Sequence, residues 1–87
     1  MALTARALCH RAAGAFALAR ADYDRLVERA PERWSLWHDR GTVRQQAGDH
    51  AGAVADYDRA VELAKGADLV TALIGRALCR RAADELA

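Results

Sequence analysis

Apolar residues along the chain recur at spacings of three and four, the spacing that places side chains on one face of an α-helix. No run of residues alternates between apolar and polar with a period of two, so the pattern predicts helices and no strands. Glycine or proline interrupts it at Gly14, Pro31, Gly48 and Gly66. The expected helices cover residues 2–13, 16–30, 34–47, 50–65 and 69–86. The fold class that follows is all-α.

One five-residue stretch occurs twice in the chain. Ala-Asp-Tyr-Asp-Arg stands at residues 21–25 and returns unchanged at residues 55–59. Between residues 6–30 and 40–64, thirteen of twenty-five positions are identical. A fixed period of about 34 residues is typical of stacked copies of one supersecondary unit, which here is a helical hairpin.

The last expected helix is a further copy of the first. Residues 6–13 return at 76–83 with one change. The distance between these two copies exceeds two full periods by two residues, which are added in the connection 65–68. Additions of this kind belong in loops between repeats. We therefore expect one domain over residues 1–87, built from repeat one (1–33), repeat two (34–67) and a terminal half repeat or capping helix (68–87).

Composition narrows the class of function. Hydrophobic residues make up 53% of the chain, chiefly alanine, the best helix former. The 13 basic and 12 acidic residues give a net charge of +1, without the basic surface that nucleic-acid binding requires. No apolar run is long enough to cross a membrane. Cys9 and Cys79 form no CxxC pair, so we expect two free, buried thiols in a cytoplasmic protein.

Candidate catalytic and metal-binding residues do not form a recognisable site. Asp22 and Asp24 lie two residues apart on a helix, which points them to different sides, so they cannot flank one reacting bond. None of His10, His38 and His50 has a second ligand one helical turn away. We therefore expect a protein that is not an enzyme and uses neither a metal nor a cofactor.

The repeat resembles the tetratricopeptide repeat (TPR) family over nearly the whole chain. The residues that carry the resemblance in the second unit are Trp37, Gly41, Gly48, Asp49, Ala53, Tyr57 and Ala60, and in the first unit Leu3, Ala7, Gly14, Ala19, Tyr23 and Pro31. The chain departs from the family pattern at Leu26, Arg40, Arg44 and Lys65, where the family commonly has a small residue, Leu, Tyr and Pro.

The resemblance implies a right-handed solenoid without catalytic activity, in which the first helix of each hairpin lines a concave groove that binds a partner protein or peptide. The groove residues that it implies are Thr4, Leu8, Arg11, His38, Asp39, Thr42, Gln45, Gln46, Ile74, Leu78 and Arg81. Some TPR domains bind a C-terminal carboxylate with a lysine and asparagine clamp. That clamp is absent here, because Thr4, Leu8 and Asp39 stand at three of its positions.

Two arginines recur, each followed by an aspartate at a fixed distance. The same spacing separates Arg6 from Asp22 and Arg40 from Asp56. The two helices of a hairpin can bring such residues face to face, so we expect two ion pairs, each between the helices of one hairpin. Arginine suits this role because its planar guanidinium holds a carboxylate in two places. The alternative is that the arginines contact a carboxylate of a partner.

The last helix has no second helix of its own repeat to cover it. Arg76 is the third copy of the repeated arginine, and its expected aspartate would lie beyond residue 87, so we expect Arg76 to be solvated, paired with a neighbouring repeat, or used at an interface. Leu69, Val70, Leu73 and Arg76 are the expected interface residues of this helix. An uncovered apolar face suggests a bound partner, a homo-oligomer, or a piece of a longer solenoid. These three alternatives stay open from the sequence.

Overall fold

The computed structural model describes residues 3–86, with the side chains of residues 6–81. These residues form five helices and no strand: α1 (Leu3–Ala12), α2 (Phe16–Arg29), α3 (Trp34–Gln46), α4 (His50–Leu63) and α5 (Ala67–Leu86). The all-α prediction is confirmed, and every helix end lies within two residues of its expected place. Because α5 begins at Ala67, Asp68 lies in its first turn.

The turns inside the two hairpins use the same chemistry. Gly14 and Gly48 have positive φ angles of 79° and 90°, a backbone conformation that glycine adopts without steric cost. In the second turn, Asp49 caps α4, because its side chain accepts a 3.0 Å hydrogen bond from the backbone N–H of Gly52. The repeat in the sequence is therefore accompanied by a repeated backbone conformation at the turn glycines.

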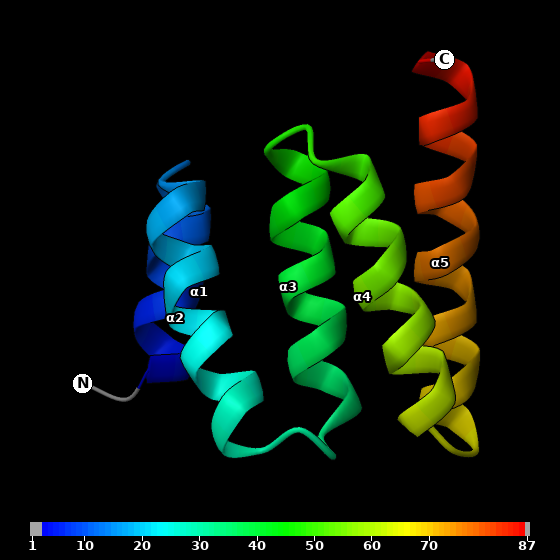
Figure 1. The fold of residues 1–87 in the computed structure, drawn as a ribbon, viewed down its shortest axis with the longest axis horizontal. Coiled ribbons are helices and arrows are strands. Elements are labelled where there is room, and N and C mark those ends of the chain that lie inside the picture. The colour runs from blue at the N-terminus through cyan, green and yellow to red at the C-terminus, as the bar shows by residue number, and fades with distance from the viewer. Residues whose placement is uncertain (1–2, 87) are drawn as a thin grey trace.

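Each helix packs on the next one along the chain, and α3 also contacts α5. Figure 1 shows the resulting order, from α1 and α2 at one end of the molecule to α5 at the other. The overall dimensions are 35 × 30 × 18 Å. Within the described residues, no helix is long and apolar enough to cross a membrane.

The core consists of three small clusters rather than one large one. The first contains Ala7, Ala19, Tyr23 and Val43, the second Ala53, Tyr57 and Cys79, and the third Ala60, Ala64 and Ala72. Small residues dominate because they let the helices approach closely. A Cβ atom added at Gly41 would lie 3.2 Å from Cβ of Asp56 and 3.3 Å from the carbonyl oxygen of Ala53, so a larger residue fits where α3 meets α4 only if these atoms give way by a few tenths of an ångström.

The first helices of the hairpins, α1 and α3, and the last helix, α5, meet in these clusters. Val43 of α3 packs with Ala7 of α1. Trp34 and Trp37, also on α3, pack with Ala72 of α5. Trp37 is fixed further by a 2.9 Å hydrogen bond from its indole N–H to the carbonyl oxygen of Pro31. We call the exposed surface that α1, α3 and α5 share the first-helix face.

The structure corrects two expectations about burial. Cys79 is fully buried, but Cys9 is exposed, because no described helix packs on that side of α1. Leu69, expected at an open interface, instead packs partly buried against the third cluster. The residue that α5 buries completely there is Ala72, one helical turn after Leu69, and its small side chain gave no signal in the apolar pattern.

Candidate functional site

Arg6 and Arg40 hold an aspartate of their own hairpin by the same pair of hydrogen bonds. Nε and Nη2 of Arg6 donate to Asp22 over 3.0 and 2.6 Å. The same two atoms of Arg40 donate to Asp56 over 3.0 and 2.7 Å. Both ion pairs predicted from the repeated spacing are therefore present. Both aspartate side chains are buried, at 7% and 2% exposure, so each carboxylate depends on its arginine for hydrogen bonds.

The pairing with Arg6 changes the acidity of Asp22. The hydrogen bonds from the Arg6 guanidinium hold the pKa of the Asp22 carboxyl below its ordinary value, and they outweigh burial, which acts in the opposite direction. His10 is also near this carboxylate, with its Nε2 atom 3.9 Å from Oδ2 of Asp22.

The second aspartate of the repeated stretch contacts the next helix along the chain. Nη1 of Arg40 donates a 2.9 Å hydrogen bond to Asp24 of α2. Nη1 of Arg76 lies 3.5 Å from Asp58 of α4, which Arg80 also contacts over 3.2 Å. Arg76 thus pairs with the neighbouring repeat, one of the three possibilities that the sequence left open. The sequence held a signal for the first of these contacts, because Asp24 precedes Arg40 by the same distance that separates Arg6 from Asp22.

The predicted groove residues lie on α1, α3 and α5, that is, on the first-helix face. All of those with described side chains are at least partly exposed. Thr4 lies outside the residues whose side chains are described. Three groove residues are large hydrophobics that remain open to solvent: Leu8 at 42%, Ile74 at 55% and Leu78 at 58% exposure.

The centre of the first-helix face is polar and internally bonded. His38 packs edge-on against the rings of Trp34 and Tyr57, with centroids 5.6 and 5.1 Å away. The hydroxyl of Tyr57 lies 2.9 Å from Oγ1 of Thr42 and 3.4 Å from Oε1 of Gln45. His38, Thr42 and Gln45 are therefore already engaged within the chain.

Charged groups on this face act on the two repeated tyrosines. Burial raises the pKa of both Tyr23 and Tyr57. The negative charge of Asp39 raises the pKa further, and the positive charge of Arg11 opposes this at both sites. Asp39 and Arg11 therefore lie within electrostatic reach of both hydroxyl groups.

The two tyrosines differ in their hydrogen bonds. Tyr23 is fully buried, and its hydroxyl has no partner among the described residues. Thr42, the hydrogen-bond partner of Tyr57, has Leu8 as its counterpart in the first repeat. Because leucine offers no polar atom, the exchange of Thr for Leu explains the unpartnered hydroxyl of Tyr23.

The outer side of α5 carries further exposed hydrophobics, Val70 at 57% and Leu73 at 38%. Leu73 is the counterpart of Trp37, and Ala77 of Gly41, once the two added residues of the connection are counted. Trp37 packs into the third cluster and Gly41 is buried, whereas Leu73 and Ala77 are exposed. Val70 and Leu73 are thus open to solvent.

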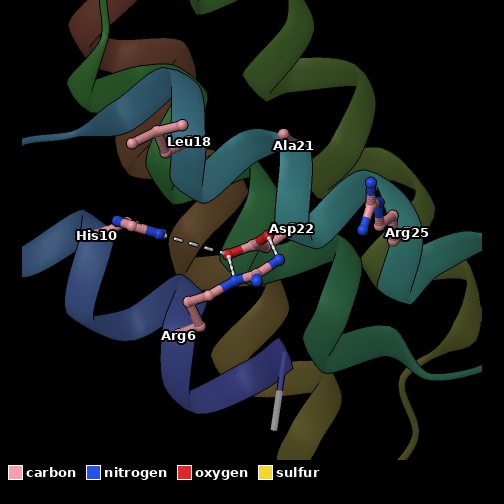
Figure 2. Close-up of a pocket in the computed structure, with 6 residues that line it drawn as sticks. All are labelled: Arg6, His10, Leu18, Ala21, Asp22 and Arg25. Atoms are coloured by element: carbon pink, nitrogen blue, oxygen red, sulfur yellow. Dashed lines mark hydrogen bonds and ion pairs between the residues drawn. The ribbon is translucent and has the colours of Figure 1, made fainter. Parts of the chain in front are cut away.

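A cavity of about 360 Å³ opens between α1 and α2 beside the first ion pair (Figure 2). Its lining residues are Arg6, His10, Leu18, Ala21, Asp22 and Arg25. Figure 2 shows Arg6 and His10 of α1 reaching toward Asp22 of α2 from the same side. Sequence reasoning did not identify this cavity, because its residues come from two helices and share no motif.

The geometry provides surfaces for contact and hydrogen bonding. In the described part of the chain, no group of three or more His, Cys, Asp or Glu side chains is placed to hold a metal ion. No family model matches the chain, and neither do any of the curated proteins or solved structures with which it was compared. Proposals about its function therefore rest on its own residues and their arrangement.

Proposed function

We propose that the chain is a non-catalytic module that binds a partner polypeptide on its first-helix face, as a short TPR-type solenoid. The observation that carries the proposal is the distribution of exposed hydrophobics. Among the described residues, three of the six large exposed hydrophobic side chains lie on this face: Leu8, Ile74 and Leu78. Exposed apolar side chains that flank polar ones are typical of an interaction surface.

The chemistry of this face sets the kind of partner. Leu8 at one end and Ile74 with Leu78 at the other offer apolar contacts. Asp39 and Gln46 between them offer polar groups, and Arg11 adds a positive charge. This combination suits a short peptide or helix that carries an apolar anchor and a polar or acidic group.

The experiment selects peptides on the purified chain from a random display library and measures their affinities for variants. Leu78→Ser removes an exposed leucine from the first-helix face. Leu18→Ser is the matched control, because Leu18 is equally exposed but lies on α2. We expect Leu78→Ser to weaken binding by about tenfold and Leu18→Ser to leave it unchanged. Equal effects of the two variants, or no selected peptide, would overturn the proposal.

A second candidate function is self-association through α5. Four of the six exposed large hydrophobics lie on this one helix. A homo-oligomer would cover Val70 and Leu73, which no described helix covers. Light scattering across a concentration series tests this: self-association predicts a mass that rises with concentration and falls again in Leu73→Ser. A single mass of one chain at every concentration excludes it.

A further inference from the structure

The repeated arginine has two kinds of carboxylate partner. Nε and Nη2 of Arg40 hold Asp56, while Nη1 points to Asp24 on the preceding helix. In the third copy, Nη1 of Arg76 again faces a carboxylate from the preceding helix, that of Asp58. The position facing Nη1 is thus a carboxylate site in two of the three copies.

The first copy has the arginine but lacks this second carboxylate. Arg6 holds Asp22 with the same two nitrogens that Arg40 uses. No acceptor for its Nη1 atom is found among the described residues, and its side chain is 44% exposed, against 12% for Arg40. One donor group of Arg6 is therefore left open.

The 360 Å³ cavity lies beside this open donor. Both oxygens of Asp22 already accept hydrogen bonds from Arg6, so the only carboxylate of the cavity is satisfied. Arg25 lines the same cavity, is exposed, and has no ion pair among the described residues. With Arg6 and Arg25 against Asp22, the cavity carries an excess positive charge. Leu18 adds an apolar wall that is 57% exposed.

The second hairpin has a longer side chain at the position that corresponds to His10. The counterparts of His10 and Leu18 in the second repeat are Arg44 and Gly52. Nη1 of Arg44 lies 3.3 Å from Asp56 and 3.5 Å from the carbonyl oxygen of Gly52, so the arginine occupies the corresponding space. Histidine is shorter than arginine, and its presence at position 10 leaves this space open.

We propose that this cavity binds an aspartate or glutamate side chain of an acidic partner polypeptide. The carboxylate takes the place at Nη1 of Arg6 that Asp24 takes at Arg40, and Arg25 pairs with it from α2. An apolar residue of the partner, one helical turn from the carboxylate, packs on Leu18. This surface is separate from the first-helix face, so it stands or falls independently of the function proposed above.

The test uses the intact chain and a synthetic alanine-rich helical peptide with one aspartate and one leucine a turn away. Binding is measured by fluorescence anisotropy at low salt, and the guanidinium signals of Arg6 and Arg25 are followed by NMR. We expect the aspartate peptide to bind and to shift both signals, and its asparagine counterpart to bind about tenfold more weakly. No binding, or equal binding of the two peptides, would overturn the proposal.

Variants of the chain distinguish specific binding in the cavity from non-specific electrostatic attraction. Arg25→Gln and Leu18→Ser change exposed residues outside the core clusters, so both variants keep the fold. We expect each of them to lower the affinity for the peptide severalfold. Arg33→Gln is the control, because it removes one exposed positive charge outside both surfaces, and it should have no effect. His10→Arg is the decisive variant. It adds a positive charge, but it refills the cavity as Arg44 does, so we expect it to abolish binding.

Stronger binding by His10→Arg would show that charge alone attracts the peptide and would overturn the proposed site. Circular dichroism of each variant establishes that the helices are intact. Acetate serves as a competitor that carries the carboxylate without the polypeptide. Saturation of the Arg6 and Arg25 signals by acetate at the concentration where the peptide binds would overturn the assignment to a polypeptide.

Discussion

Nη1 of Arg40 donates a 2.9 Å hydrogen bond to Oδ1 of Asp24, a residue of the preceding hairpin. The other two nitrogens of the same guanidinium hold Asp56 on the following helix. One side chain on α3 therefore joins α2 to α4. The two aspartates of the repeated Ala-Asp-Tyr-Asp-Arg stretch have different roles: the first closes its own hairpin, and the second connects that hairpin to the next helix.

The two partners of Arg40 should contribute unequally to stability. The Asp56 side chain is 2% exposed and that of Asp24 is 41% exposed. Asp56→Asn removes the buried carboxylate and leaves the Arg40 side chain, 12% exposed, with only the solvent-screened Asp24, so we expect it to lower the free energy of unfolding by about 3–5 kcal/mol. Asp24→Asn breaks a solvent-screened pair and should cost less than about 1 kcal/mol. Urea denaturation measures both, and similar losses for the two variants would contradict this ranking.

Stability should fall on acidification through Asp22. Its folded-state pKa is lowered by Arg6, so the carboxylate stabilises the fold at pH values above its unfolded pKa of about 4. This contribution is lost as the pH falls through the lower folded-state pKa, when the carboxyl becomes protonated. We expect urea midpoints to drop below about pH 4 in the wild-type chain, and to drop less in Asp22→Asn.

Glu32→Gln is the control for the acid experiment. Glu32 is exposed and has no ion pair among the described residues, so this variant should keep the pH profile of the wild-type chain. A profile for Asp22→Asn that matches the wild type at every pH would show that Asp22 does not carry the acid sensitivity.

The helices and the contacts inside each hairpin could be predicted from the sequence, whereas only one of the two ion-pair contacts between hairpins, that of Asp24 with Arg40, had a signal in the spacing. The period of the repeat fixes which residues of two adjoining helices face each other, so the spacing of Arg6 and Asp22 was enough to pair them. The contact of Arg76 with Asp58 depends on how one hairpin sits on the next, and the two added residues in the connection 65–68 break the spacing.

The burial of side chains on the outer helices, α1 and α5, also could not be predicted from the sequence. Cys9 and Cys79 stand at equivalent places in two copies of the same helix, yet one is exposed and the other is fully buried. The difference arises from α4, which packs on α5 and has no described counterpart against α1. The cavity at Arg6 was missed for a related reason, because it depends on the absence of a long side chain at His10.

The two cysteines should react at very different rates. Cys9 is exposed, whereas burial raises the pKa of the Cys79 thiol and so reduces its thiolate fraction. We expect a disulfide reagent such as DTNB to modify one thiol quickly in the native chain and the second only in denaturant. The quick phase should disappear in Cys9→Ser and persist in Cys79→Ser. Two quick phases in the native chain would contradict the burial of Cys79.

The repeated tyrosines allow a matched test of one hydrogen bond. Tyr57 bonds to Thr42, so Tyr57→Phe should cost about 1 kcal/mol of unfolding free energy. Tyr23 has an unpartnered buried hydroxyl, so Tyr23→Phe should be neutral or stabilising.

Leu8→Thr extends the comparison. It gives α1 a threonine at the position that corresponds to Thr42, the hydrogen-bond partner of Tyr57. In that background Tyr23 gains a partner, and removal of its hydroxyl should become costly, by about 1 kcal/mol. Urea denaturation of Tyr23→Phe, Leu8→Thr and the double variant completes a cycle that isolates this new bond. An interaction free energy of zero from this cycle would contradict the explanation that Leu8, in place of threonine, leaves the Tyr23 hydroxyl without a partner.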